Sequence, residues 1–150
     1  MQQRIRKNKN ISRKKARIEV ILALFTVMTL FIGGCAPKGV PEGFNEEVVI
    51  SQAKEVVMLM SARNYEGVVD RFSEIMKEAL PENSLESALD ETITKLGAFK
   101  EYRSVAAGSG ENPTIGKFAV VVIKASYENG EAIYTISIDK DGKLTGLYLK

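Results

Sequence analysis

The sequence contains no histidine and no tryptophan, and it has one cysteine among its 150 residues. Histidine is the most frequent general base and one of the commonest metal ligands in proteins. Its absence excludes catalytic sites of the Ser-His-Asp and Cys-His types and zinc sites that combine cysteine with histidine. The chain also lacks a P-loop, a G-x-S-x-G motif and a G-x-G-x-x-G motif. A disulfide within the chain is excluded, because the cysteine has no partner thiol.

The N-terminal segment has the three zones of a secretory signal peptide. Eight basic residues lie between Arg4 and Arg17, and thirteen residues without charge follow from Val20 to Ile32. Two small residues, Gly33 and Gly34, then precede Cys35. The apolar run is shorter than the roughly 20 residues that a membrane-spanning helix needs. This order of zones predicts export, and the lack of a twin-arginine pair favours the general secretion route.

The residues Ile32, Gly33, Gly34 and Cys35 resemble the lipobox of bacterial prolipoproteins. The resemblance implies that the Cys35 thiol receives a diacylglyceryl group and that the leader is cleaved just before it. Two acyl chains give stable membrane anchoring, whereas one gives marginal binding. We therefore expect a lipid-anchored protein on the extracytoplasmic face of the cell membrane. An uncleaved signal-anchor helix is the alternative, and a nucleic-acid-binding arm is disfavoured because the basic run continues into an apolar segment.

Three regions follow from these features: a signal peptide at residues 1–34, a lipid-anchored tether at 35–44 and one domain at 45–150. The leader holds eight of the 21 basic residues and one of the 19 acidic residues. Residues 35–150 therefore carry 13 basic and 18 acidic residues, a net charge of −5. This balance argues against nucleic acid or an anionic surface as the partner of the mature domain.

Apolar residues at helical spacing predict three helices in the first half of the domain. Asn45 is suited to cap the first helix. The second is expected to begin after Asn64 and to be stopped by Pro81. The third is expected to be capped by Ser84 and to end at Gly97. The apolar stripe of the second helix consists of Tyr65, Val68, Val69, Phe72 and Met76.

The second half of the domain reads as four strands. They are expected at 99–107, 117–127, 131–139 and 144–149, with Gly108-Ser109-Gly110 as a loop. Asn129-Gly130 and Asp141-Gly142 predict two-residue hairpin turns in which both positions have positive φ. The apolar run 118–123 indicates a central strand covered on both faces. The expected class is α+β, with three N-terminal helices packed on one face of a four-stranded antiparallel meander.

Several short patterns are spread over this region: Asn64-Tyr65, Phe72 through Lys77, Leu96-Gly97-x-Phe99, Tyr127-x-Asn129-Gly130 and Asp139-x-Asp141-Gly142-Lys143-Leu144-x-Gly146-Leu147. Together they resemble a family of small secreted or lipid-anchored domains of unknown function, the DUF3887 type, with an NTF2-like fold. The resemblance implies a cone-shaped fold with a cavity. Enzymes, ligand-binding proteins and interaction modules all occur among NTF2-like folds, and domains of this family also occur beside hydrolase domains. Leu89 stands near the place where members often carry an aromatic residue.

Five residues are candidates to line such a cavity: Tyr65, Phe72, Met76, Tyr134 and Ile136. Tyr134 shares a strand face with Ile136 and Ile138, so it is the candidate whose hydroxyl would point into the cavity. The segment 139–142 superficially matches the start of a calcium loop, but residues 143–145 supply no carboxylate. We therefore interpret it as a hairpin turn and expect neither a metal nor a cofactor.

The leading functional prediction is a non-catalytic, membrane-anchored module that binds a small apolar ligand or an envelope protein, with at most a weak homodimer. The alternative is an isomerase-like enzyme or an accessory module of an envelope hydrolase. An isomerase of this kind needs a buried carboxylate of raised pKa beside a tyrosine. The available groups are Asp70, Asp90, Glu101, Tyr65, Tyr102, Tyr127, Tyr134 and Tyr148.

Overall fold

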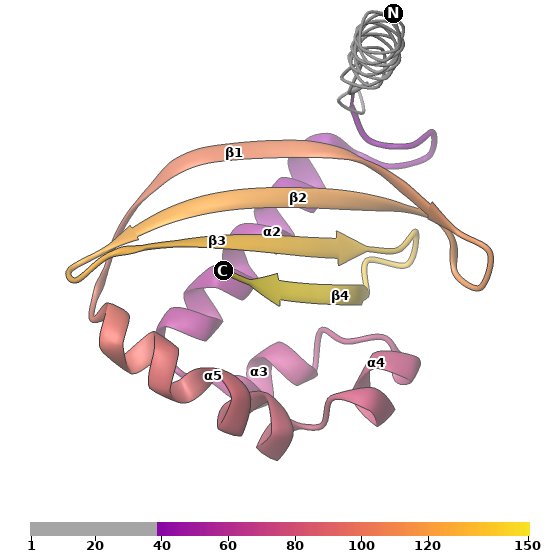
Figure 1. The fold of residues 1–150 in the computed structure, drawn as a ribbon. Coiled ribbons are helices and arrows are strands. Elements are labelled where there is room, and N and C mark those ends of the chain that lie inside the picture. Colours follow the sequence, from indigo (N-terminus) through magenta and orange to yellow (C-terminus); the bar gives the residue numbers. More distant parts are fainter. Residues whose placement is uncertain (1–38) are drawn as a thin grey trace, which may run out of the picture. The chain divides into compact units, whose positions relative to one another are not determined.

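The computed structural model describes residues 39–150, which form helices followed by strands (Figure 1). The helices are α2 (Glu46–Ser61), α3 (Tyr65–Val69), α4 (Glu74–Ala79) and α5 (Glu82–Leu96). The strands are β1 (Phe99–Asn112), β2 (Gly116–Tyr127), β3 (Glu131–Ile138) and β4 (Leu144–Leu149). The α+β class is confirmed. No helix in this part of the chain is long and apolar enough to cross a membrane. The predicted lipobox, Ile32 to Cys35, lies outside the described residues.

The four strands form one antiparallel sheet in the order β1-β2-β3-β4, so the predicted meander is confirmed. Alternate residues of β2 and β3 are buried, among them Val121, Ile123 and Ile136. In Figure 1, α2 lies across one face of the sheet, while α3, α4 and α5 lie on the side of β4. The core therefore sits between α2 and this inner face, and the buried residues form one cluster.

Helix α2 forms where the sequence predicts it. The Asn45 side chain accepts a hydrogen bond from the Val48 N–H at 3.1 Å, which satisfies one of the free donors of the first turn. Glu46 and Glu47 add favourable charge at the same end. The buried stripe consists of Val49, Ala53, Val56, Val57 and Met60.

The prediction of one continuous second helix is wrong, because two separate helices, α3 and α4, occupy this region. Between them Phe72 forms a parallel bridge with Leu144 of β4. The Ser73 N–H donates to the Leu144 carbonyl at 2.8 Å, and the Leu144 N–H donates to the Arg71 carbonyl at 2.8 Å. These bonds to the sheet edge replace helical ones, and Ser73 then caps α4. The domain thus has four described helices before the sheet, not three.

Helix α5 begins earlier than predicted. Pro81 is its N-cap and Ser84 lies inside its first turn, so the predicted cap is wrong. Its C-terminal glycine is confirmed: Gly97 has φ 76° and ψ −155°. The β2–β3 turn packs against this helix end. The Asn129 N–H donates to the Leu96 carbonyl at 2.9 Å, and the Ala98 N–H donates to the Glu128 carboxylate at 3.1 Å. Two of the patterns that carry the family resemblance, 96–99 and 127–130, are therefore in contact at the C-terminal end of α5.

Two expectations for the sheet are corrected. Gly108-Ser109-Gly110 belongs to β1 and is not a loop, because β1 pairs with β2 as far as Asn112 and Gly116. At Gly110 a Cβ would lie too close to the ring of Phe118 on the paired strand, so a larger residue would need that ring to move. Strand β2 is covered on one face only: Val121 is buried, whereas Val122 is 39% exposed.

The hairpin turns also differ from the prediction, although both hairpins form. Neither Asn129 nor Gly130 has positive φ, and the Tyr127 N–H donates to the Gly130 carbonyl across the turn. The β2–β3 turn therefore lacks two-residue geometry. Its Asn129 N–H instead donates to the Leu96 carbonyl at the end of α5. In the β3–β4 turn only Gly142 has positive φ, because the Asp139 side chain closes a longer loop.

Candidate functional site

The sheet face turned away from α2 is the candidate functional site, and we call it the outer face. One row of paired residues crosses all four strands: Ala106, Val122, Thr135 and Tyr148. The next row consists of Gly108, Val120, Ser137 and Gly146. Neither row contains a charge, and most of these side chains are small. The outer face is therefore defined as these eight residues, an uncharged surface.

The outer face exposes one aromatic and one aliphatic side chain. The side chain of Tyr148 is 62% exposed, and that of Val122 on the central strand is 39% exposed. Ile133, in the adjoining row, is 38% exposed. That row also contains Lys124, whose Nζ lies 2.8 Å from the Glu131 carboxylate. The apolar surface is thus bordered by an ion pair, as the polar rim of a protein interface is.

The inner side of the sheet contains a chain of hydrogen-bonded hydroxyls. Ser61 donates to the Val57 carbonyl at 2.7 Å, and its oxygen lies 2.8 Å from the Tyr127 hydroxyl. The Tyr127 hydroxyl lies 2.6 Å from that of Tyr134. Because Ser61 has one proton to donate, the chain runs from Tyr134 to Tyr127, then to Ser61 and Val57. Burial, helped by the bond with Tyr127, raises the pKa of Tyr134 far above its ordinary 10.0.

The structure brings the predicted cavity-lining residues together. Tyr65, Phe72, Tyr134 and Ile136 are buried in the single core cluster, and Met76 packs against it. The Tyr134 hydroxyl is bonded to Tyr127 within the protein. A cavity lined by these five residues stays a prediction.

An acid and a tyrosine from the predicted set do lie side by side. The Tyr65 hydroxyl donates to Asp90 Oδ1 at 3.0 Å, and burial with this bond raises the pKa of Tyr65 to about 12. Arg63 makes a two-pronged ion pair with the same carboxylate at 2.6 and 2.7 Å. Its hydrogen bonds lower the pKa of Asp90 below the ordinary 3.8. An isomerase-like base requires the opposite shift.

Arg63 was not singled out by the sequence. It occupies a left-handed conformation with φ 58° just after α2, where glycine is commonest. Its ion pair with Asp90 joins the α2–α3 turn to α5. This contact accounts for an arginine, not a glycine, at the position with positive φ. The sequence did place a helix start after Asn64, so the few residues between the two helices were the available sign of a tight turn at Arg63.

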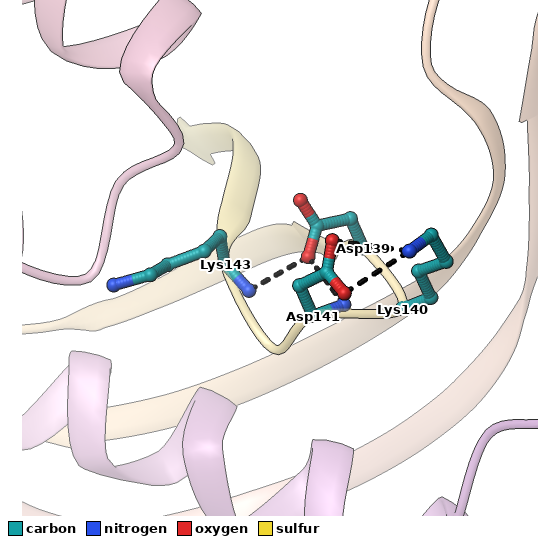
Figure 2. Close-up of polar contacts among 4 residues, drawn as sticks. All are labelled: Asp139, Lys140, Asp141 and Lys143. Carbon is teal, nitrogen blue, oxygen red and sulfur yellow. Dashed lines mark hydrogen bonds and ion pairs between the residues drawn. The ribbon is translucent and has the colours of Figure 1, made fainter.

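Figure 2 shows that the Asp139 loop is a closed turn. Asp139 Oδ1 accepts hydrogen bonds from the backbone N–H groups of Asp141 and Lys143 at 2.9 and 2.8 Å. The Lys140 Nζ lies 3.1 Å from the Asp141 carboxylate. Asp139 Oδ1 is thus used by the loop itself, and the Asp141 carboxylate pairs with Lys140, which agrees with the interpretation as a turn. Among residues 39–150, no group of three or more His, Cys, Asp or Glu residues is placed to hold a metal ion.

A small open groove lies at the end of the sheet that holds the β1–β2 hairpin. Its volume is about 160 Å³, and its walls are Pro41, Ser109, Gly110, Glu111 and Lys117. Pro41 is buried, so the segment before α2 is seated against this hairpin. The groove is too small for a drug-sized ligand, whose sites are typically about 300–1,000 Å³.

A four-stranded antiparallel meander with α2 across one face and an uncharged outer face defines a small α+β domain. The chain belongs to the family described as "Protein of unknown function (DUF3887)", whose model matches residues 53–147. It is similar to the NMR structure of a protein from Ruminococcus gnavus ATCC 29149, with 30% sequence identity and a TM-score of 0.64. The match covers 75% of this chain and 96% of that one. A search of curated proteins found no match.

Proposed function

We propose that this protein is an extracytoplasmic lipoprotein, anchored through Cys35, whose domain is a non-catalytic protein-binding module. The anchor is supported by the order of basic, apolar and small residues before Cys35. It would deliver the mature chain, residues 35–150, to the outer surface of the cell membrane. The same proposal includes the NTF2-like cone, for which the bent sheet with α2 across one face gives support.

The observation that carries the binding function is the row Ala106, Val122, Thr135 and Tyr148 on the outer face. Exposed aromatic and aliphatic side chains bordered by polar groups are typical of protein interaction sites. Small residues in the neighbouring row let a partner approach the sheet closely. Tyr148 is the expected anchor, because it combines the largest exposed apolar surface of the row with a hydroxyl.

A protein partner suits this geometry better than a small apolar ligand. The eight residues of the outer face are spread over all four strands, whereas a small-molecule site is a concave pocket. The inner face, where a ligand would enter a cone, has its tyrosine hydroxyls bonded to one another. Binding of a small ligand is therefore the weaker form of the proposal. The partner we propose is another envelope protein, and pairing of two copies through the same face is expected to be weak.

Site-specific photo-crosslinking in intact membranes tests this function. A photoreactive phenylalanine analogue at Tyr148 is expected to give a discrete adduct, and one at Ile75 on α4, which is 64% exposed, is the matched control. The second change Val122→Glu, which places a charge in the row, is expected to remove the adduct without lowering the melting temperature.

The size of the adduct distinguishes the partners. A larger protein supports the proposal, while an adduct of twice the chain mass would make self-association the function of this face. If Tyr148 and Ile75 give the same adducts, the outer face is not the binding site.

A further inference from the structure

The ordered domain begins very close to the proposed lipid anchor. Val40 packs against the core, Pro41 is buried, and Phe44 packs against the core as well. The Phe44 N–H also donates to the Pro41 carbonyl at 3.1 Å. Residues 40–44 were expected to belong to a tether, but they are part of the folded unit.

The connection between the proposed anchor and the folded unit is therefore short. Four residues, 36–39, separate Cys35 from Val40. Five residue steps span at most about 17 Å when fully extended. A domain of about 110 residues has a radius of gyration of about 13 Å and hence a diameter of about 34 Å. The connection is thus shorter than the domain is wide, and the domain cannot turn its far end to the membrane.

The residues around the anchored segment belong to one end of the sheet. Pro41 shares the groove with Ser109, Gly110, Glu111 and Lys117, which flank the β1–β2 turn. Figure 1 shows the segment before α2 beside this part of β1. The opposite end of β2 lies eleven residue steps away, or about 36 Å for an extended strand.

We infer that the domain stands on the lipid surface by its β1–β2 hairpin end, with residues 113–115 at the headgroups. This inference rests on the proposed lipidation of Cys35. The strands of the hairpin then extend away from the membrane. The outer face is therefore exposed to molecules beside the domain on the membrane surface. The partner of that face is accordingly a protein held beside this one on the same membrane.

Electrostatic attraction does not produce this orientation. Glu42, Glu46, Glu47 and Glu111 lie at or near this end, against Lys117. An acidic end is not attracted to a bilayer with anionic lipids. The short connection alone holds the hairpin near the headgroups, so a longer connection releases it.

The full-length lipoprotein in phosphatidylcholine vesicles allows a direct test. Thr114→Cys at the hairpin turn and Lys100→Cys near the other end of β1 are both exposed positions for a fluorescent maleimide. Lipidated Cys35 cannot react with the maleimide. A nitroxide on the lipid headgroups is expected to quench the label at residue 114 at least threefold more than the label at residue 100.

Two controls separate the inference from the lipidation itself. A 20-residue Gly/Ser insertion between Ala36 and Pro37 adds about 25 Å of average reach, and it is expected to bring the quenching ratio close to one. Equal quenching of both labels in the protein without insertion would overturn the orientation. A protein that fails to float with the vesicles, and whose Cys35 reacts with maleimide, would overturn the anchor and this inference together.

Discussion

At the residue scale, the hydroxyl chain of Ser61, Tyr127 and Tyr134 has a direction that mutations can reveal. Tyr127 is its middle member and Tyr134 its donor end. Tyr127→Phe leaves the fully buried Tyr134 hydroxyl without a partner, at a cost of about 1–3 kcal/mol. Tyr134→Phe leaves Tyr127 bonded to Ser61, so its cost should be smaller, about 0.5–1.5 kcal/mol.

Urea unfolding of the two single variants and the double variant checks this order. In the double variant no buried hydroxyl lacks a partner, so it should be no less stable than Tyr127→Phe alone. If the stability losses of the two single variants add up in the double variant, the proposed order of hydrogen bonds from Tyr134 to Tyr127 to Ser61 is wrong.

Asp90 gives a second prediction at this scale, concerning pH. Its pKa is lowered in the folded protein by the hydrogen bonds from Arg63. A carboxyl group with a lowered folded pKa stabilises the protein above its unfolded pKa, and the stabilisation is lost as pH falls through the folded value. Relative to Asp90→Asn, the native protein should therefore be more stable at pH 6 and lose that advantage below the ordinary value of 3.8.

The free energy of unfolding, measured for both proteins between pH 6 and pH 3, tests the sign. Glu91→Gln is the matched control, since Glu91 pairs with Lys95 on the exposed side of the same helix. An advantage that grows as pH falls would mean that the Arg63–Asp90 pair does not form in solution.

At the element scale, the junction between α5 and the β2–β3 turn depends on Gly97. Its φ and ψ lie in a region that is essentially restricted to glycine, and a Cβ there would lie 2.9 Å from the Glu128 carboxylate. Gly43 also has positive φ, at 88°, but has open space around it. We expect Gly97→Ala to cost about 1–3 kcal/mol and to exceed the cost of Gly43→Ala.

Thermal unfolding of the two alanine variants measures the difference. Far-ultraviolet circular dichroism should show that both variants keep their helix content. Equal melting temperatures would show that the turn does not pack on α5 as described.

The elements also show what the sequence could predict. Helix α2 and strand β3 follow from local signals, a capping asparagine and an alternating strand after a turn. The division of the second helix could not be predicted, because it depends on hydrogen bonds between residues 71–73 and Leu144, far away in the sequence. The length of β1 was missed for a similar reason: its glycines suggested a loop, while the ring of Phe118 on the paired strand packs over one of them, Gly110.

The candidate site was predictable only in part. The alternation of Ile133, Thr135 and Ser137 on one side of β3 was evident from the sequence, and the structure places them on the outer side. Val122 was missed because it lies within a continuous apolar run that favoured cover on both faces. The alignment of Val122 with Tyr148 depends on register across three strands, which a single sequence does not specify.

At the scale of the whole molecule, the proposed function combines an anchor, a short connection and an exposed face. The connection limits how the domain stands on the membrane, and the outer face is then presented to neighbours on the same surface. The net negative charge of residues 35–150 disfavours nucleic acid or an anionic surface as the partner, and it is compatible with a protein. Each part depends on the modification of Cys35, because a free domain would have no fixed orientation.

Mass spectrometry of the protein purified from the membranes of a bacterial host therefore tests the central claim most directly. The account predicts a chain that begins at Cys35 and carries the added mass of a diacylglyceryl group, and it predicts that Cys35→Ala retains residues 1–34 without acyl chains. A wild-type chain that keeps its leader and has a free thiol at Cys35 would contradict it.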